Sequence, residues 1–139
     1  MHRRPLGRAR RLAAGSAIVM IVGCLLPWET LGGDNNLPAL SSNAFEASGI
    51  LVFLAALATL ALVTLPFASE RPFAIDRWTS FLVILAVAVL GLILRVPTLL
   101  QDGVLSLRPD RAPGLYVVVI GLAGLARATL EVFQEPEVR

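Results

Sequence analysis

The sequence predicts an all-α fold: an integral membrane four-helix bundle with both termini in the cytoplasm (N-in/C-in), in a single transmembrane domain covering residues 1–139. Composition is the first indication, because 56% of the residues are hydrophobic and 16% are charged, with a mean hydropathy of +0.76. Soluble domains have about 45–50% apolar and 25% charged residues. The second indication is a series of four apolar runs long enough to cross a bilayer. The third is the uneven distribution of arginine among the segments between these runs.

A basic tail over residues 1–11 precedes the first predicted span, 12–28. All 12 basic residues of the chain are arginine, and the tail holds five of them: Arg3, Arg4, Arg8, Arg10 and Arg11. About 17 uncharged residues, at about 1.5 Å of rise per residue, just cross the hydrocarbon core. The tail is typical of a cytoplasmic anchor attracted to anionic lipid. It lacks the interleaved aromatic and polar residues of a nucleic-acid-binding surface, so we expect no nucleic-acid partner.

Three further spans are predicted at 47–67, 78–100 and 113–133. The run 47–67 carries no charge and ends beside Pro66. The run 78–100 is interrupted by Arg95 and Pro97. The run 113–133 opens on Pro113, a residue favoured in the first helical turn, and becomes polar from Arg127 onward.

The connections contain residues that favour turns, and two positions suit helix caps. The longest connection, 29–46, contains two glycines, two asparagines and a proline between residues 32 and 38. Asn43 and Glu46 have the spacing of a capping box at the entry to the second helix. Asp76 is expected to cap the third helix.

The arginines define the expected orientation. An internal N-terminus places nine arginines on the cytoplasmic side: Arg3, Arg4, Arg8, Arg10, Arg11, Arg71, Arg77, Arg127 and Arg139. The outer side receives Arg108 and Arg111, with Arg95 near its boundary, while the connection 29–46 holds three acids and no base. Trp28 and Tyr116 are expected at the outer interface and Trp78 at the inner one. We therefore expect a multi-pass protein of the bacterial inner membrane.

Arg95 and Arg127 are charged residues inside predicted spans, which makes each a candidate functional residue. Arg95 lies about 25 Å along the helix from Trp78, near the outer boundary. We expect it to form an ion pair with one of the outer acids Glu29, Asp34, Glu46 and Asp102; a contact to substrate or lipid headgroup is the alternative. Arg127 is expected to extend toward the inner surface or to pair with Glu131, Glu70 or Asp76.

Ile21-Val22-Gly23-Cys24 fits the lipobox pattern of bacterial lipoprotein signal peptides. Cleavage there would leave Cys24 as a lipidated N-terminus beside three remaining spans. The apolar run continues through Leu25 and Leu26, however, and cleavage would remove most of the cytoplasmic charge. We therefore favour a retained first helix in which Cys24 is a small buried residue.

The residue types missing from the predicted spans limit the chemistry that we expect of this chain. The middle of each predicted span lacks Asp, Glu, His and Lys, and the only histidine is His2. We therefore predict no catalytic residues, no cofactor-binding residues and no metal ligands, so the chain is not expected to be an enzyme. A lipid-active enzyme would require Glu46, Arg95, Asp102 and Asp110 to converge at one interface. Small multidrug exporters have a similar length, but the Glu of their first span is missing here.

Small residues recur within the predicted helices and favour close helix packing, which is the main source of helix association in lipid. The first helix carries Gly15, Ser16 and Gly23, and the fourth carries Gly121 and Gly124. The same pattern would also dock a partner helix.

Leu26-Pro27-Trp28, a glycine-bearing outer loop and Asn43-Ala44-Phe45-Glu46-Ala47-Ser48-Gly49 together resemble a set of small uncharacterised four-helix bacterial inner-membrane proteins. The resemblance implies the same topology over most of the chain and supplies no active site. The arrangement also resembles that of claudins, although the loop is shorter and lacks their Gly-Leu-Trp motif and cysteine pair.

These features predict an accessory, scaffold or assembly subunit that acts by helix packing and by contacts of the outer loop. The expected contact residues are Trp28, Phe45 and Glu46, with interfacial anchoring and capping as their alternative roles. The expected partners are the lipid bilayer and either another membrane protein or further copies of the chain. The alternative function is a small oligomeric transporter or channel for an anionic or amphipathic solute, with Arg95 recruiting the anion.

Overall fold

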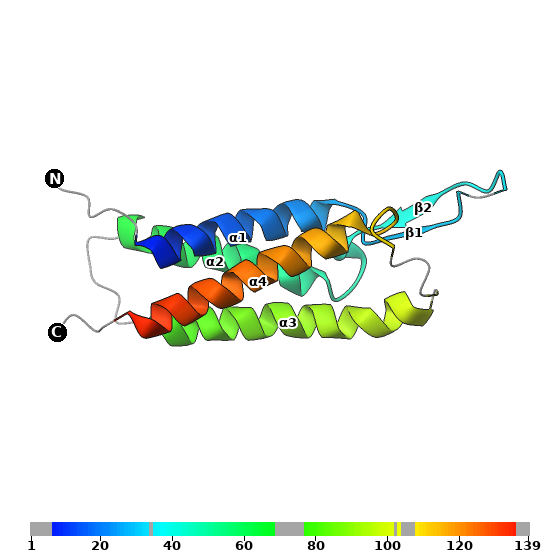
Figure 1. The fold of residues 1–139 in the computed structure, drawn as a ribbon. Helices are drawn as coiled ribbons and strands as arrows, with labels where there is room; N and C mark the ends of the chain where they lie inside the picture. The colour runs from blue at the N-terminus through cyan, green and yellow to red at the C-terminus, as the bar shows by residue number, and fades with distance from the viewer. Residues whose placement is uncertain (1–6, 34, 69–76, 102, 104–107, 136–139) are drawn as a thin grey trace.

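The computed structural model describes residues 7–33, 35–68, 77–101, 103 and 108–135, which are mostly helical. Four long helices are present: α1 (Arg8–Leu25), α2 (Ile50–Ala68), α3 (Arg77–Gln101) and α4 (Pro113–Gln134). Between α1 and α2 lie two short strands, β1 (Glu29–Leu31) and β2 (Leu40–Ser42), and a 3₁₀ turn, η1 (Ala44–Glu46). Figure 1 shows the four helices side by side, and we refer to them together as the helical body.

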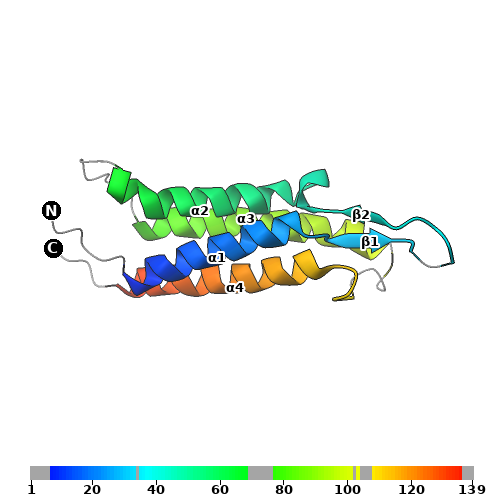
Figure 2. The ribbon, with the colours of Figure 1, turned by 90° about the horizontal axis from the view of Figure 1, so that it is seen from above.

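Each helix contacts two neighbours. Helix α1 packs against α2 and α4, and α3 packs against the same two helices from the other side. The first turn of α1 and the last turn of α4 lie at one end of the helical body, and the β1–β2 hairpin projects beyond the opposite end (Figures 1 and 2). Inserted in a bilayer, the helical body would therefore carry the hairpin on one side of the membrane.

Three of the helices are long and apolar enough to cross a membrane. They are α2, the Trp78–Gln101 part of α3, and α4, with mean hydropathies of 2.5, 2.5 and 1.7. Helix α1 is not among them, because three of its 18 residues are the arginines Arg8, Arg10 and Arg11. Its uncharged part, from Leu12 onward, is about 21 Å long. The membrane and multi-pass character is thus supported by three helices, and the fourth span remains a prediction.

Three predicted helix limits differ from the observed ones by three residues or more. Helix α1 begins at Arg8 rather than at residue 12, inside the predicted tail. Helix α1 ends at Leu25 rather than at residue 28, because Leu26 is extended (ψ 156°) and the following Pro27 lacks the N–H that a helix requires. Helix α2 begins at Ile50 rather than at residue 47. The reason is that Asn43 caps η1 instead, with its Oδ1 accepting a hydrogen bond from the Phe45 N–H at 3.0 Å. The predicted cap at Asp76 lies outside the described residues.

The antiparallel hairpin is an addition to the all-α prediction. Glu29 pairs with Ser42 and Leu31 with Leu40. Its connection turns back through four residues with positive φ: Gly32, Gly33, Asn35 and Asn36. Glycine adopts this region without a steric penalty and asparagine tolerates it, so the turn residues of the sequence form a hairpin rather than a simple loop.

The closest helix contact lies between α1 and α4, where glycines bring the backbones together. A Cβ added to Gly23 would lie 2.6 Å from Val118 Cγ2, and one added to Gly114 would lie 2.6 Å from the Gly23 carbonyl oxygen. One added to Gly121 would lie 2.6 Å from Met20 Cγ. The expected close packing is thus present at Gly23 and Gly121, whereas Gly15 faces open space.

Two glycines of α1 provide a matched test of this contact. Gly23→Ala is expected to destabilise the protein by about 1–3 kcal/mol, because the added methyl group overlaps Val118. Gly15→Ala meets nothing within 4 Å, so it should stabilise the helix by about 0.5–1 kcal/mol. Thermal unfolding of both variants in detergent measures the difference. Equal stabilities would contradict the α1–α4 packing.

Candidate functional site

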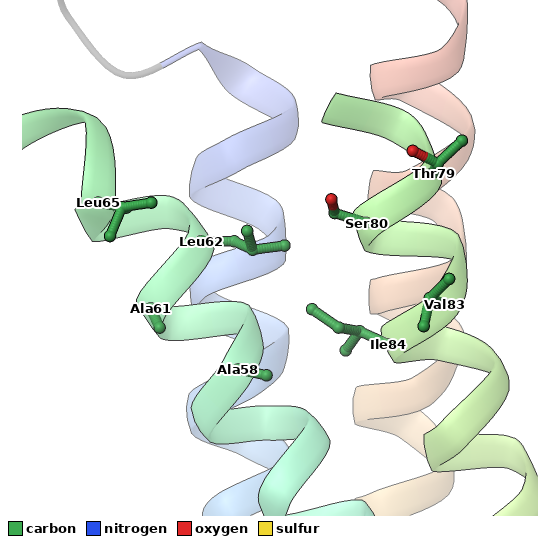
Figure 3. Close-up of a pocket in the computed structure, with 8 residues that line it drawn as sticks. All are labelled: Ala58, Ala61, Leu62, Leu65, Thr79, Ser80, Val83 and Ile84. Atoms are coloured by element: carbon green, nitrogen blue, oxygen red, sulfur yellow. The ribbon is translucent and has the colours of Figure 1, made fainter. Parts of the chain in front are cut away.

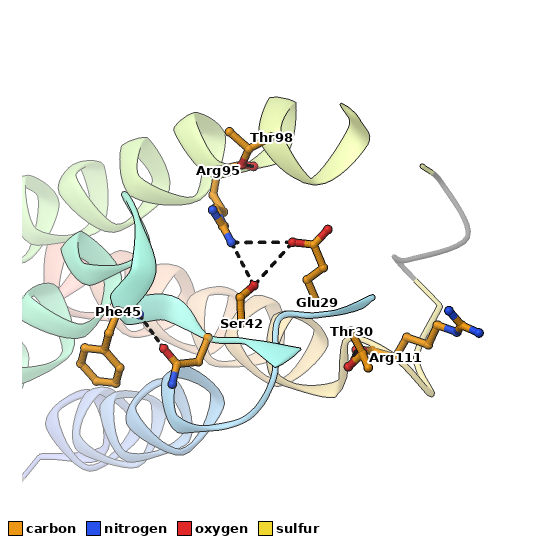
Figure 4. Close-up of polar contacts among 8 residues, drawn as sticks. Glu29, Thr30, Ser42, Phe45, Arg95, Thr98 and Arg111 are labelled. Carbon is orange, nitrogen blue, oxygen red and sulfur yellow. Dashed lines mark hydrogen bonds and ion pairs between the residues drawn. The ribbon is translucent and has the colours of Figure 1, made fainter. Parts of the chain in front are cut away.

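The main buried polar cluster joins the hairpin to α3. Arg95 lies near the hairpin end of α3, and its side chain points toward Glu29 of β1 and Ser42 of β2 (Figure 4). The strand register places Glu29 directly opposite Ser42, so both side chains stand on the same face of the hairpin. The cluster therefore depends on the pairing of two strands that the sequence analysis did not predict.

The contacts of this cluster form a triangle. Arg95 Nη2 lies 3.2 Å from Ser42 Oγ, to which it donates, and 3.9 Å from Glu29 Oε2. The Ser42 hydroxyl donates to the same Glu29 oxygen at 3.5 Å. The side chains of Arg95 and Glu29 are only 10% and 7% exposed. Of the two expected acids that the structure describes, Glu29 and Glu46, Glu29 is the one placed against Arg95.

Because both charges are buried, the ion pair affects the position of the hairpin more than the net stability of the protein. Transferring two charges out of water costs several kcal/mol per ion, and the attraction between them largely offsets that cost without a large surplus. Among the described residues, Arg95 Nε has no hydrogen-bond acceptor. The pair therefore contributes less to net stability than to the position of the hairpin, because any other position would leave one of the charges buried alone.

Trp28 provides a second attachment at the base of the hairpin. Its side chain is fully buried, with 0% exposure, and its indole Nε1 donates to the Gly23 carbonyl at 2.9 Å. Its backbone N–H donates to the Ser42 carbonyl at 2.8 Å, which extends the strand pairing by one bond. The ring of Trp28 is thus covered by the protein itself and offers no surface to a partner, while its expected level at the outer interface stays a prediction. The chain leaves α1 through the extended Leu26, and the ring joins the hydrophobic core.

Two further hydrogen bonds tie the hairpin to the start of α4. Thr30 Oγ1 donates to the Arg111 carbonyl at 2.9 Å, and the Gly114 N–H donates to the Pro27 carbonyl at 2.9 Å. Together with the Arg95 cluster and Trp28, these bonds hold β1 against both α3 and α4. The base of the hairpin is thus fixed to the helical body.

The hairpin exposes three leucines beside its polar residues Asn35, Asn36 and Ser41. Leu31, Leu37 and Leu40 are 40%, 65% and 70% exposed. The sequence did carry a signal for these leucines, because large apolar residues do not favour turns and stand out in a connection rich in Gly and Asn. Of the predicted contact residues, Glu46 is exposed, and Phe45 is partly exposed and packs edge-to-face on Phe53 with ring centroids 4.9 Å apart.

Arg127 lies toward the end of the helical body opposite the hairpin, whereas Cys24 lies in the last turn of α1, at the hairpin end. Arg127 Nε lies 3.4 Å from Glu131 Oε1 on the same helix, and its side chain is 71% exposed. Cys24 is fully buried within α1. Cleavage before Cys24 would remove the core residues Ala13, Ala17 and Met20, which favours a retained helix.

The convergence required for a lipid-active enzyme is absent from the described part of the chain. Glu46 and Asp110 are exposed, and no ion pair joins either to Arg95 there. Three other acids of the predictions, Asp34, Glu70 and Asp102, lie outside the described residues, as does His2. Within the described ranges, no group of three His, Cys, Asp or Glu residues is close enough to hold a metal ion.

A groove of about 490 Å³ opens between α2 and α3 toward the end opposite the hairpin (Figure 3). Its lining combines six apolar residues with two hydroxyl-bearing ones: Ala58, Ala61, Leu62, Leu65, Thr79, Ser80, Val83 and Ile84. The short side chains of Ala58 and Ala61 leave the space. Since no charged side chain lines the groove, it offers an apolar packing surface rather than a site for a polar ligand.

The buried ion pair yields a direct test. Arg95→Ala is expected to destabilise the protein by about 3–5 kcal/mol, because Glu29 would remain buried without its cationic partner. Arg95→Met combined with Glu29→Gln should recover much of this loss, because no buried charge then lacks its counterion. Arg108→Ala, an exposed position at the same end, is the control and should change stability little. Thermal unfolding and protease cleavage of the hairpin measure these effects; similar results for Arg95→Ala and Arg108→Ala would refute the role of the pair.

Comparison with protein-family models, curated proteins and solved structures finds no match for this chain. The resemblance to small bacterial inner-membrane proteins, and the weaker one to claudins, therefore stays an expectation based on the residues that suggested it. The function is argued below from the hairpin and the surfaces of the helical body.

Proposed function

We propose that this chain is a four-helix bundle of the bacterial inner membrane that acts as an accessory, scaffold or assembly subunit and presents the β1–β2 hairpin outside the membrane. The observation that carries the proposal is a hairpin that exposes three leucines and is attached to the helical body by a buried ion pair. Hairpins that serve only as connections do not need such an attachment.

The distribution of arginine supports a cytoplasmic N-terminus and a cytoplasmic C-terminus. Arg8, Arg10 and Arg11 in α1 and the Arg127–Glu131 pair in α4 lie toward one end of the helical body. The aromatic pair Trp78–Phe133, with ring centroids 5.3 Å apart, lies toward the same end. Positive charge is retained on the cytoplasmic side, and aromatic rings favour the interface, so this end is assigned to the cytoplasm and the hairpin to the outer side.

The exposed leucines support a protein partner for the hairpin. The connection between β1 and β2, which contains Leu37, projects beyond the ends of the helices (Figures 1 and 2), where lipid tails would not cover it, and Leu31 and Leu40 are paired at its base. Clustered apolar side chains in water are typical of protein contact surfaces. The short strands also leave backbone groups at the hairpin edges, which suits the addition of a partner strand.

The alternative, a small transporter, has less support. Its anion would be recruited by Arg95, but this side chain is 10% exposed and engaged with Ser42 and Glu29. The apolar groove is a second feature of the described residues that suits a solute, and it ends at Ile84, about 16 Å along α3 from Arg95. The two features do not form a continuous path.

Orientation is tested by labelling from outside the cell. In a Cys24→Ala background, Leu37→Cys is expected to react with a membrane-impermeant maleimide in intact cells, because the hairpin is outside and Leu37 is 65% exposed. Gln134→Cys, exposed at the other end of the helical body, should react only after the cells are opened. The reverse pattern would place the hairpin in the cytoplasm and refute the N-in/C-in arrangement.

The contact role is tested by photocrosslinking in living cells. A photoreactive amino acid at Leu40, which is 70% exposed, is expected to give a discrete adduct with one protein, because the hairpin surface is a contact site. Leu54, an exposed position on α2, is the control and should give lipid adducts. Leu37→Asp should reduce the Leu40 adduct at least about tenfold, because a charge in an apolar contact must be desolvated. Lack of a protein adduct at Leu40 would refute the accessory-subunit proposal.

A further inference from the structure

The groove between α2 and α3 closes toward the hairpin and opens toward the other end of the helical body. At the closed end, Gly91 of α3 touches α2: a Cβ added there would lie 2.8 Å from Leu51 Cβ and 3.0 Å from the Ser48 carbonyl oxygen. Farther from the hairpin, Leu62 and Ile84 point toward each other across a space of about 490 Å³ (Figure 3). The two helices therefore form a wedge with one open end.

The groove lies at the depth of the lipid tails when α2 and α3 cross a membrane, as their length and hydropathy allow. Its lining extends from Ala58 to Leu65 along α2, about 10 Å at the rise of an α-helix. Trp78, which precedes the lining residue Thr79 and packs on Phe133, marks the membrane interface at the open end. The groove thus stays within one leaflet, whose hydrocarbon layer is about 15 Å thick.

The polarity of the lining changes along the groove. The two hydroxyl-bearing residues, Thr79 and Ser80, lie at the interface end, and the six others are Ala, Leu, Val or Ile. A bound water molecule needs several polar partners, so water would not fill the apolar part. A molecule that is polar at one end and apolar along its length matches this order.

The shape of the groove favours an acyl chain over a helix as its occupant. A helix with its side chains is about 10–12 Å wide and would enter a groove of this size only with single side chains. An acyl chain is one methylene group wide and bends at each bond, so it can follow the narrowing space toward Gly91. Ala58 and Ala61 leave room for it on the α2 side. Its atoms would also supply the dispersion contacts that an empty groove forfeits.

We infer that the α2–α3 groove binds one acyl chain of a phospholipid from the leaflet on the side away from the hairpin, with the ester groups of that lipid beside Thr79 and Ser80. The bound chain joins α2 to α3 in the part of the helical body where the two helices stand apart. This site rests on insertion of α2 and α3 in a membrane and is independent of any partner of the hairpin.

Lipid retention tests the site. The full chain, extracted from native membranes in a mild detergent, is expected to carry one phospholipid per chain in native mass spectrometry. Ala61→Leu should lower the lipid-bound fraction at least about tenfold, because the larger side chain takes the space of the acyl chain. Ala123→Leu makes the same change at an exposed position of α4 and should leave this fraction unchanged. Equal retention by the two variants, or a wild-type chain without lipid, would overturn the inference.

Photolabelling locates the bound lipid. The full chain is placed in phosphatidylcholine vesicles that contain a phosphatidylcholine with a photoreactive group in one acyl chain, and labelling is expected to concentrate on residues 58–65 and 79–84. Equal labelling of Ile18 and Val22, exposed on α1, would show that lipid only surrounds the protein and would refute a bound chain. A partner protein that occupies the groove in place of lipid and is lost in Ala61→Leu would refute it as well. None of these outcomes changes the photocrosslinking expected at Leu40, which tests the role of the hairpin separately.

Discussion

The close approach of α1 to α4 is the contact on which the rest of this structure depends. Gly23 and Gly114 lie so near one another that neither position has room for a side chain. Because β1 follows α1 after three residues, and the Gly114 N–H bonds to the Pro27 carbonyl, the same contact fixes the base of the hairpin. The helix interface and the hairpin position are thus set together, and a shift of either helix along the other would displace both.

The buried polar cluster fixes the direction in which the hairpin leaves the helical body. A hairpin held only at its base would swing, but the Arg95–Glu29 pair joins it to α3, which does not belong to the α1–α4 contact. Buried charges tolerate few alternative arrangements because each must keep its counterion. The protein therefore combines nonpolar packing, which brings the helices together, with a polar constraint that orients the part outside them.

Local sequence was sufficient to predict the helices, but it did not predict the hairpin between α1 and α2. Pro113 and the apolar runs placed three helices to within a few residues, since these signals act within a single segment. The strands are only three residues long, so no alternating pattern distinguished them from a turn. Sequence left four acids as possible partners of Arg95, and the position of Glu29 beside it follows from the strand register. The burial of Trp28 likewise follows from the path of the chain through the extended Leu26.

The arginines at the start of α1 have a consequence for the surrounding lipid. Only about 21 Å of this helix is free of charge, against about 30 Å for a typical hydrocarbon core. Helices α2, α3 and α4 are longer and more apolar, so the hydrophobic thickness of the protein is uneven around its perimeter. Inserted in a bilayer, the protein would require lipids beside the exposed residues Ile18 and Val22 to compress to meet α1. Such a mismatch would make the protein prefer thin regions of bilayer, and it would favour neighbours that deform the membrane in the same way.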